Sequence, residues 1–409
     1  MDVDFNLAVA LVGGLLLITS ALSGWLQGNV LSITVLAVAA GIGLALTDVI
    51  IVEPESPGLI EVVELALVLT LFTDGLTVEQ ELLRERWRDP VRAIAIAMPL
   101  TLVLTALAAK LLFPELTWIE VFLLGAVLAP TDPVVTSTVV TSAKVPPKVR
   151  HALNLESGLN DGLALPFVLV LLVATSAEGG ATAEAINTGF ESLAGAGIGA
   201  ALAYAAGAIF LRLPTDGVSG RYEGVYALAV PLLAYGVAEA TIGNGLIATF
   251  VSGVVLGIRI PDVPEAFPKF NENLGSIFQV VTFVLFGALV VSVGGGVEAL
   301  PVIGLIVVLL LVARPLAIAI SYAGSSFTRP EKTFIAWFGP KGVASMLFAL
   351  FVLESTAPDR VELFEIISYV ILASIAAHGL TDTVGARWVE RKLQAADGAA
   401  VPDVTPTRP

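Results

Sequence analysis

Long apolar runs separated by short polar connections dominate the amino-acid sequence. An α-helix rises about 1.5 Å per residue, so about 20 apolar residues cross the roughly 30 Å hydrocarbon core of a bilayer. The pattern therefore predicts an all-α polytopic membrane protein with about thirteen transmembrane helices. The runs lie at residues 5–24, 29–48, 58–80, 91–113, 117–141, 148–175, 185–211, 222–242, 244–260, 271–293, 297–323, 331–354 and 362–386.

Two of these runs are interrupted by residues that break helices. The fifth run contains Ala129-Pro130-Thr131-Asp132-Pro133, and the twelfth contains Gly339-Pro340-Lys341-Gly342. Proline removes a backbone donor and breaks a helix interior. The fifth and twelfth runs are an odd number of crossings apart, so their helices run in opposite directions through the membrane. Such a pair indicates inverted repeats, and paired interrupted helices are the best sequence pointer to a transporter's binding site.

Composition and charge support a membrane protein and predict its orientation. Of the 409 residues, 56% are hydrophobic and 14% are charged, and the mean hydropathy is +0.90. This balance excludes a soluble domain of this size. With the N-terminus outside, the outer loops hold only Lys110 and Arg360 of the 21 basic residues, while Arg314 and Lys341 fall inside runs. The other basic residues lie on the opposite face, which the positive-inside rule assigns to the cytoplasm together with the C-terminus.

The expected organisation is one transmembrane transporter domain over residues 1–394. A short polar tail over residues 395–409 follows it, and we expect this tail to be disordered and cytoplasmic. The sequence has no cysteine and only two histidines, which excludes disulfides and a histidine-based metal site.

The sixth run carries a carboxylate where a charge is unfavourable. Asp161 follows Lys148 by 13 residues, or roughly 20 Å of helix, which places it in the middle third of the membrane. A charge at that depth costs roughly 2.5–3.5 kcal/mol on insertion scales, so such residues usually serve function. Ser157 lies four residues before Asp161 and shares its helical face.

Other polar and small residues in these two runs suit a cation site. The interruption in the fifth run combines freed backbone carbonyls with the Thr131 hydroxyl and the Asp132 carboxylate. Hard oxygen ligands of this kind suit sodium or another small hard cation. In the sixth run, Gly158 and Gly162 are four apart and form a groove that another backbone can approach closely.

These motifs carry a resemblance to a known family. The segment Glu156-Ser157-Gly158-Leu159-Asn160-Asp161-Gly162, with the upstream Thr131-Asp132-Pro133, resembles the monovalent cation/proton antiporters, specifically the NhaP-type sodium/proton exchangers. The resemblance covers nearly the whole chain, since thirteen spans and two crossed, interrupted helices also fit it. It implies exchange of a cation, sodium or lithium, for a proton by alternating access.

The resemblance also implies roles for individual residues. Asp161 would be the carboxylate that binds the cation or the proton. Ser157 and Thr131 would be further cation ligands, with Asp132 acting through water. Asn160 is similar to the family's asparagine that holds Asp132 in place.

Four charged residues complete this picture. Asp74, in Phe72-Thr73-Asp74-Gly75-Leu76, resembles the family's further carboxylate near the ion, where glutamate is more usual. Arg314 lies in an apolar run and needs a carboxylate partner, for which the resemblance names Glu156 in a structural ion pair. Lys341 resembles the basic residue at the helix crossing, where arginine is usual, and would offset helix-end carbonyls and Asp132.

The resemblance further implies an assembly and a stoichiometry. Spans 4–6 and 11–13 would form a moving core, and the remaining spans would form a scaffold and a homodimer interface in the plasma membrane. Asn160 cannot titrate, so one ionisable carboxylate remains in the Asn160–Asp161 pair, and we expect electroneutral one-for-one exchange. We expect no cofactor and no nucleic-acid partner.

Three alternatives stay open. Potassium/proton exchange is one, because sodium and potassium both take oxygen ligands. An intramembrane aspartyl protease using Asp132 and Asp161 is another, although the Gly-x-Gly-Asp signature of those enzymes is absent. A channel is the third, but one titratable site with a competing proton suits exchange better.

Overall fold

The computed structural model describes residues 5–26, 32–53, 57–82, 91–132, 135, 142–176, 181–212, 222–260 and 263–399. Across these ranges the regular secondary structure is helical, as the sequence predicts, and contains no strand. In chain order the elements are α1 (Phe5–Leu26), α2 (Ile33–Leu46), α3 (Pro57–Leu82), the π-helical turn η1 (Ala93–Ala97) continuing into α5 (Met98–Leu112), α6 (Trp118–Leu128), α8 (Pro147–Ser176), α9 (Ala181–Arg212), α10 (Glu223–Glu239), α11 (Gly245–Arg259), α12 (Ala266–Val293), α13 (Ala299–Val308), the π-helical turn η3 (Leu309–Ala313), α14 (Arg314–Ser321), α15 (Arg329–Trp337), α16 (Val343–Glu354) and α17 (Arg360–Ala399).

Every predicted apolar run contains a helix or a succession of helices. Among the described residues, six helical segments are long and apolar enough to cross a membrane, and several shorter apolar helices accompany them. The all-α membrane architecture is therefore confirmed. The count of thirteen crossings stays a prediction.

Both predicted interruptions are present. In the fifth run α6 ends at Leu128, and residues 129–132 are not helical. Residues 133–134 and 136–141 of that run, including Pro133, lie outside the described residues. In the twelfth run α15 ends at Trp337 and α16 begins at Val343. The first halves of these two runs, α6 and α15, begin with the same signal, a capping box that pairs Thr117 with Glu120 and Thr328 with Glu331.

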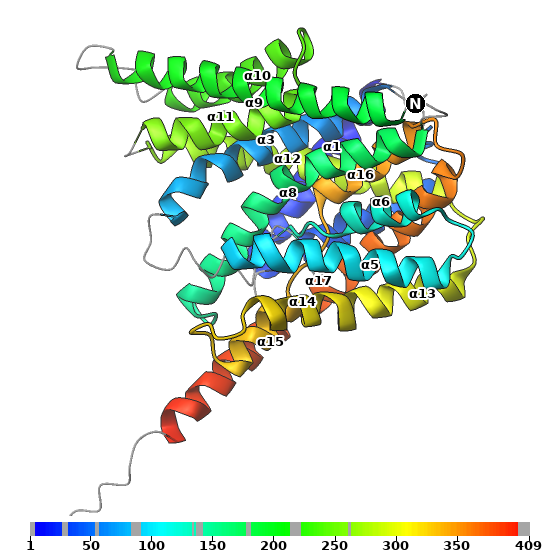
Figure 1. The fold of residues 1–409 in the computed structure, drawn as a ribbon. Helices are drawn as coiled ribbons and strands as arrows, with labels where there is room; N and C mark the ends of the chain where they lie inside the picture. The colour runs from blue at the N-terminus through cyan, green and yellow to red at the C-terminus, as the bar shows by residue number, and fades with distance from the viewer. Residues whose placement is uncertain are drawn as a thin grey trace, which may run out of the picture.

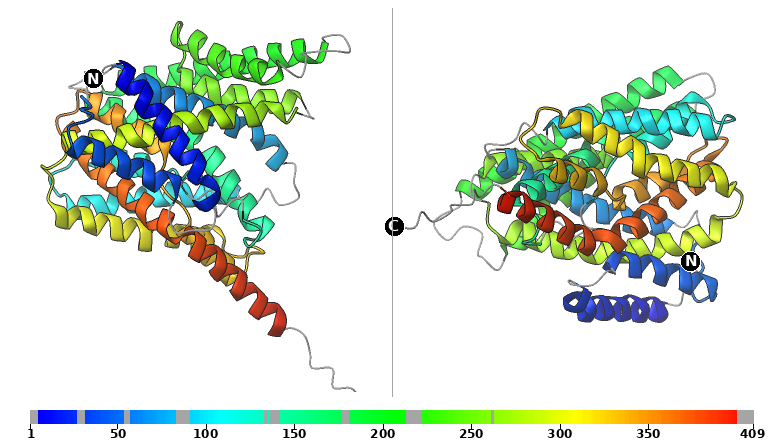
Figure 2. Two further views of the ribbon diagram at one scale, coloured as in Figure 1. Left: turned by 180° about the vertical axis from the view of Figure 1, so that it is seen from behind. Right: turned by 90° about the horizontal axis from the view of Figure 1, so that it is seen from below.

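Residue contacts gather the helices into two groups (Figure 1). In one group α3 packs against α11 and α12, α11 against α9 and α10, and α2 against α12. In the other, α5 packs against α6 and α13, α14 against α15, and α16 against α17. Helix α8 runs between them and contacts α6 on one side and α3 and α9 on the other. Helix α1 lies at the edge of the bundle, beside α2 (Figure 2).

The last helix is longer than the sequence predicts. Helix α17 continues to Ala399, past the expected start of the tail at residue 395, and projects beyond the rest of the bundle (Figure 2). Its final turns are rich in good helix formers such as Glu, Arg, Lys, Gln and Ala, which favour continuation of the helix. The rest of the expected tail, residues 400–409, lies outside the described residues.

One buried ion pair links α8 to the second group. Arg314 Nη1 lies 2.8 Å from Glu156 Oε1, and each residue is 4% exposed. Arg314 Nη2 also donates to the carbonyls of Ile335 and Phe338, at 3.4 and 3.2 Å, where α15 ends. A basic group at a helix C-terminus satisfies carbonyls that have no partner within the helix. The pair therefore holds three segments together: α8, α14 and the end of α15.

We predict that Arg314→Ala destabilises the protein strongly. The substitution leaves the Glu156 carboxylate buried without its counter-ion, and breaking one partner of a buried pair typically costs about 3–5 kcal/mol. The measurement is the melting temperature in detergent. Arg329→Ala is the matched control, because Arg329 is exposed at the start of α15 and surface substitutions usually change stability little. Equal melting temperatures for the two variants would show that the ion pair does not stabilise the fold.

Candidate functional site

The two interrupted segments cross each other near the middle of the bundle. The backbone N–H of Asp132 donates to the carbonyl of Pro340 at 2.8 Å, and Ser345 Oγ donates to the carbonyl of Val127 at 2.8 Å. At the crossing, a Cβ added to Gly342 would lie 2.0 Å from Asp132 Oδ2. Only glycine allows this approach, so Gly342 sets how close the two segments lie.

Each helix end at the crossing faces a charge supplied by the other segment. Lys341 Nζ donates to the carbonyls of Ala129 and Pro130, at 3.3 and 3.0 Å, where α6 ends. In the opposite sense, the N–H of Val343, the first residue of α16, donates to Asp132 Oδ2 at 3.2 Å. A cation is favourable at a helix C-terminus and an anion at an N-terminus. Asp132 and Lys341 are buried, so little water screens these interactions.

Helix α8 contacts the crossing through two side chains of its polar segment. Ser157 Oγ donates to the carbonyl of Thr131 at 2.6 Å, and Asn160 Nδ2 donates to Thr131 Oγ1 at 2.8 Å. The resemblance leads one to expect Asn160 to hold Asp132. In the structure the Asn160 amide donates to Thr131, the residue before Asp132.

Asp161 is buried on α8, one residue beyond Asn160, with 3% of its surface exposed. Among the described residues, Asp161 Oδ1 and Asn160 Oδ1 have no hydrogen-bond partner. Buried oxygens without a partner are unusual in folded proteins, because the loss of hydration is then uncompensated. These two atoms are acceptors that a cation or a proton donor can use.

Asp74 approaches α8 from the neighbouring helix α3. A Cβ added to Gly158 would lie 3.4 Å from Asp74 Cβ and 3.5 Å from Asp74 Oδ1. Gly158 directly follows Ser157, so the Asp74 carboxylate lies over the same turn of α8. Unlike Asp161, Asp74 is only half-buried.

The structure thus brings all the predicted residues to one region around α8 and the crossing. The available groups are carboxylates, hydroxyls and carbonyls, which suit a hard cation. In the part of the chain that the structure describes, no cluster of three or more His, Cys, Asp or Glu side chains forms a metal site. His378, on α17, is buried, and its ring nitrogens lie within hydrogen-bonding distance of the carbonyls of Ser374 and Trp337.

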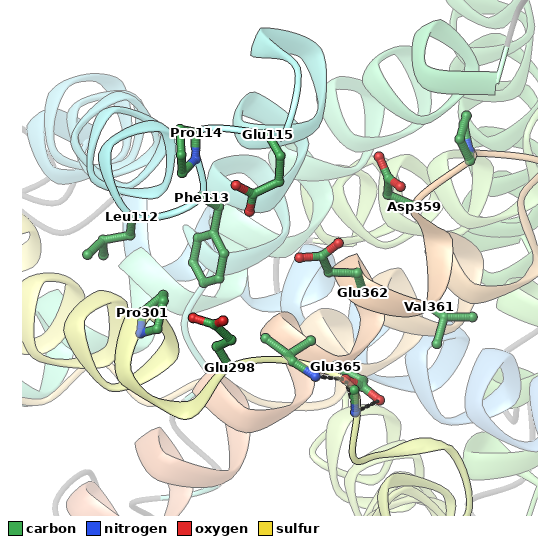
Figure 3. Close-up of a pocket in the computed structure, with 13 residues that line it drawn as sticks. Leu112, Phe113, Pro114, Glu115, Glu298, Pro301, Asp359, Val361, Glu362 and Glu365 are labelled. Carbon is green, nitrogen blue, oxygen red and sulfur yellow. Dashed lines mark hydrogen bonds between the residues drawn. The ribbon is translucent and has the colours of Figure 1, made fainter.

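A second acidic region, not singled out in the sequence, lines a cavity of about 720 Å³ (Figure 3). The cavity lies between the end of α5, the loop before α13 and the start of α17, and none of the predicted site residues lines it. Its carboxylates include Glu115, Glu298 and Glu362. Partial loss of hydration and the nearby Glu120 carboxylate raise the pKa of Asp359 in the adjoining loop. Glu365 is buried here and accepts hydrogen bonds from the N–H groups of residues 296 and 297.

Known proteins similar in sequence to this chain are named cation/proton antiporters. A K(+)/H(+) antiporter NhaP from Alkalimonas amylolytica is 29% identical over 348 residues, which cover 83% of this chain and 59% of the relative. A Na(+)/H(+) antiporter from Schizosaccharomyces pombe is 26% identical over 377 residues, covering 81% of this chain and 78% of the relative. The chain thus spans about three fifths of the length of the Alkalimonas protein.

The fold has a counterpart among solved structures. The sodium proton antiporter MjNhaP1 from Methanocaldococcus jannaschii superposes with a TM-score of 0.74, at 19% sequence identity, over 94% of this chain and 98% of that one. The family model described as "Sodium/hydrogen exchanger, transmembrane" matches residues 8–384, which include every helix that forms the crossing and the site. The chain therefore belongs to the sodium/hydrogen exchanger family.

Proposed function

We propose that this protein is a secondary antiporter that exchanges a monovalent cation for a proton across a membrane. The observation that carries the proposal is the buried Asp161 carboxylate, which has an oxygen without a hydrogen-bond partner among the described residues and lies on the helix that contacts the crossing. Family membership supports the same reaction. In this proposal Asp161 binds either the cation or the proton, never both.

The surrounding groups would complete the cation site. Ser157 Oγ donates its hydrogen to the Thr131 carbonyl, and Thr131 Oγ1 accepts one from Asn160. A hydroxyl oxygen has two lone pairs, so each oxygen keeps a lone pair that can contact a cation. Asp132 would act through water, because its own oxygen already caps α16. Lys341 would hold the end of α6 beside α16 through its hydrogen bonds to the carbonyls of Ala129 and Pro130. Asp74 would be a further carboxylate beside the site.

We further propose how the protein works in the membrane. The group that contains α5, α6, α8 and α13–α17 would move against the group that contains α1–α3 and α9–α12, exposing Asp161 to each side in turn. The group that contains α1–α3 and α9–α12 would also form a homodimer interface. The N-terminus would lie outside and the C-terminus in the cytoplasm, with the protein in the plasma membrane.

Two cations are candidates. Sodium, with lithium as a related substrate, follows from the resemblance of the Asn160–Asp161 segment to sodium/proton exchangers. Potassium is the second, since the Alkalimonas relative and the NhaP2 relatives from Shewanella are named K(+)/H(+) antiporters. Both ions take oxygen ligands, so the site chemistry suits either.

We predict that Asp161→Asn abolishes exchange. The amide can bind neither a proton nor a cation as a carboxylate does. Neither substrate would then be carried by residue 161, and cation and proton transport would no longer be coupled. Proteoliposomes with an imposed pH gradient provide the measurement, with sodium, lithium and potassium added in separate trials. Asp48→Asn is the matched control, because Asp48 is exposed and its positive φ of 55° is one that asparagine also tolerates. Normal cation-driven proton flux in folded Asp161→Asn would remove the central claim.

We also predict that exchange is electroneutral. Asn160 cannot titrate, so the Asn160–Asp161 pair provides a single ionisable group and would carry one charge in each direction. The exchange rate should then stay constant when the membrane potential of the vesicles is clamped at several values. A rate that follows the potential would contradict one-for-one exchange and would identify Asp74 or Asp132 as a second proton carrier.

A further inference from the structure

Two side chains from neighbouring helices lie on the glycine groove of α8, one turn apart. The Asp74 side chain faces Gly158, as described above. The ring of Phe250, on α11, faces Gly162: a Cβ added there would lie 2.6–2.7 Å from three atoms of the ring. Phe250 is 8% exposed, so its ring is packed directly on the backbone of α8 next to Asp161.

The helices that carry these two side chains are locked to each other by backbone contacts. A Cβ added to Gly75 of α3 would lie 2.5 Å from the carbonyl oxygen of Phe250, and one added to Gly253 of α11 would lie 2.3 Å from that of Phe72. Gly257 approaches the carbonyl of Leu76 in the same way, at 2.7 Å. Interdigitated backbones of this kind resist sliding. Helices α3 and α11, which lie side by side (Figure 1), therefore behave as one body.

Helix α8 meets this body differently. At Gly158 and Gly162 the contacts are with side chains, the whole of the Asp74 side chain from Cβ to Oδ1 and the ring of Phe250. A flat ring on a glycine has no ridge to interlock with, so these two contacts do not oppose a shift of α8 along its axis. The two glycines are four residues apart, or about 6 Å along the helix, close to the one-turn step by which packed helices ratchet past each other.

We propose that Phe250 is a gate residue with two alternative seats on α8, that is, two glycines on which its ring packs. The seats are Gly162 in one state and Gly158 in the other. In the present structure the ring lies on Gly162, on the Ser176 side of Asp161, and Asp74 lies on Gly158, on the Pro147 side. In this proposal the ring therefore closes the site toward the Ser176 end. A one-turn shift of α8 relative to α3 and α11 moves Gly158 under the ring. Asp161 then lies on the other side of the ring, open toward the Ser176 end. This inference rests on the proposed exchange function and assigns the residue that switches access.

A methyl group at Gly158, where the ring does not lie in the present structure, tests this directly. In the present structure a Cβ at Gly158 makes ordinary van der Waals contacts, so Gly158→Ala should fold with an unchanged melting temperature. The methyl would block the ring in the second state, and exchange in proteoliposomes should fall at least ten-fold. Removing the ring should relieve the block, so Phe250→Ala combined with Gly158→Ala should exchange faster than Gly158→Ala alone. Gly43→Ala, on α2 with nothing within 4 Å of its added Cβ, is the matched control.

The absence of cysteine from the chain allows a second test that needs no transport. Gly162→Cys with Phe250→Cys should cross-link in membranes and trap the present state, and Gly158→Cys with Phe250→Cys should cross-link and trap the shifted one. A pair at 158 and 250 that never cross-links, while the pair at 162 and 250 does, would overturn the two-seat gate. So would wild-type exchange in Gly158→Ala, or a loss of exchange that Phe250→Ala does not relieve. Lack of any cation-driven flux in the unaltered protein would instead overturn the proposed function.

Discussion

The site depends on one constraint: two helices end in the interior, and their unpaired backbone groups must be satisfied there. At the crossing, each segment supplies a charged side chain that satisfies the helix end of the other segment. Lys341 from one segment binds the carbonyls that end α6, and Asp132 from the other binds the amide that begins α16. Because each charge lies at the helix end it favours, neither is left unpaired in a medium of low dielectric. These contacts position Thr131, to which Ser157 and Asn160 of α8 donate hydrogen bonds.

Much of this could be predicted from residues that are costly in an apolar setting. Pro130, Pro340 and Gly342 mark the interruptions. Asp161 and Arg314 stand out because a charge in an apolar run is costly and usually has a functional or structural role. Arg314 was matched to Glu156 by resemblance, and the two side chains are in contact. The Thr-x-x-Glu boxes that begin α6 and α15 are a further sequence signal, which marks the starts of the two interrupted runs.

Other features could not be predicted, for physical reasons. Phe250 lies in an apolar run, and no local pattern distinguishes a phenylalanine that faces Gly162 from one that faces lipid. The hydrogen bond from the Asn160 amide to Thr131 depends on a separation of a few ångströms, which residue spacing does not encode. The acidic cavity gathers carboxylates from three separate loops and helix ends, so its existence depends on the tertiary fold.

The central claim is that a cation and a proton compete for the Asp161 carboxylate. Isothermal titration calorimetry of the purified protein, repeated in buffers of different ionisation enthalpy, reports both cation affinity and the protons released on binding. The account predicts that binding of the transported cation releases protons, weakens as the pH falls, and is lost in Asp161→Asn, since a ligand that must deprotonate its site binds in a pH-dependent way. Cation binding that releases no proton and keeps the same affinity between about pH 6 and 8 would contradict it.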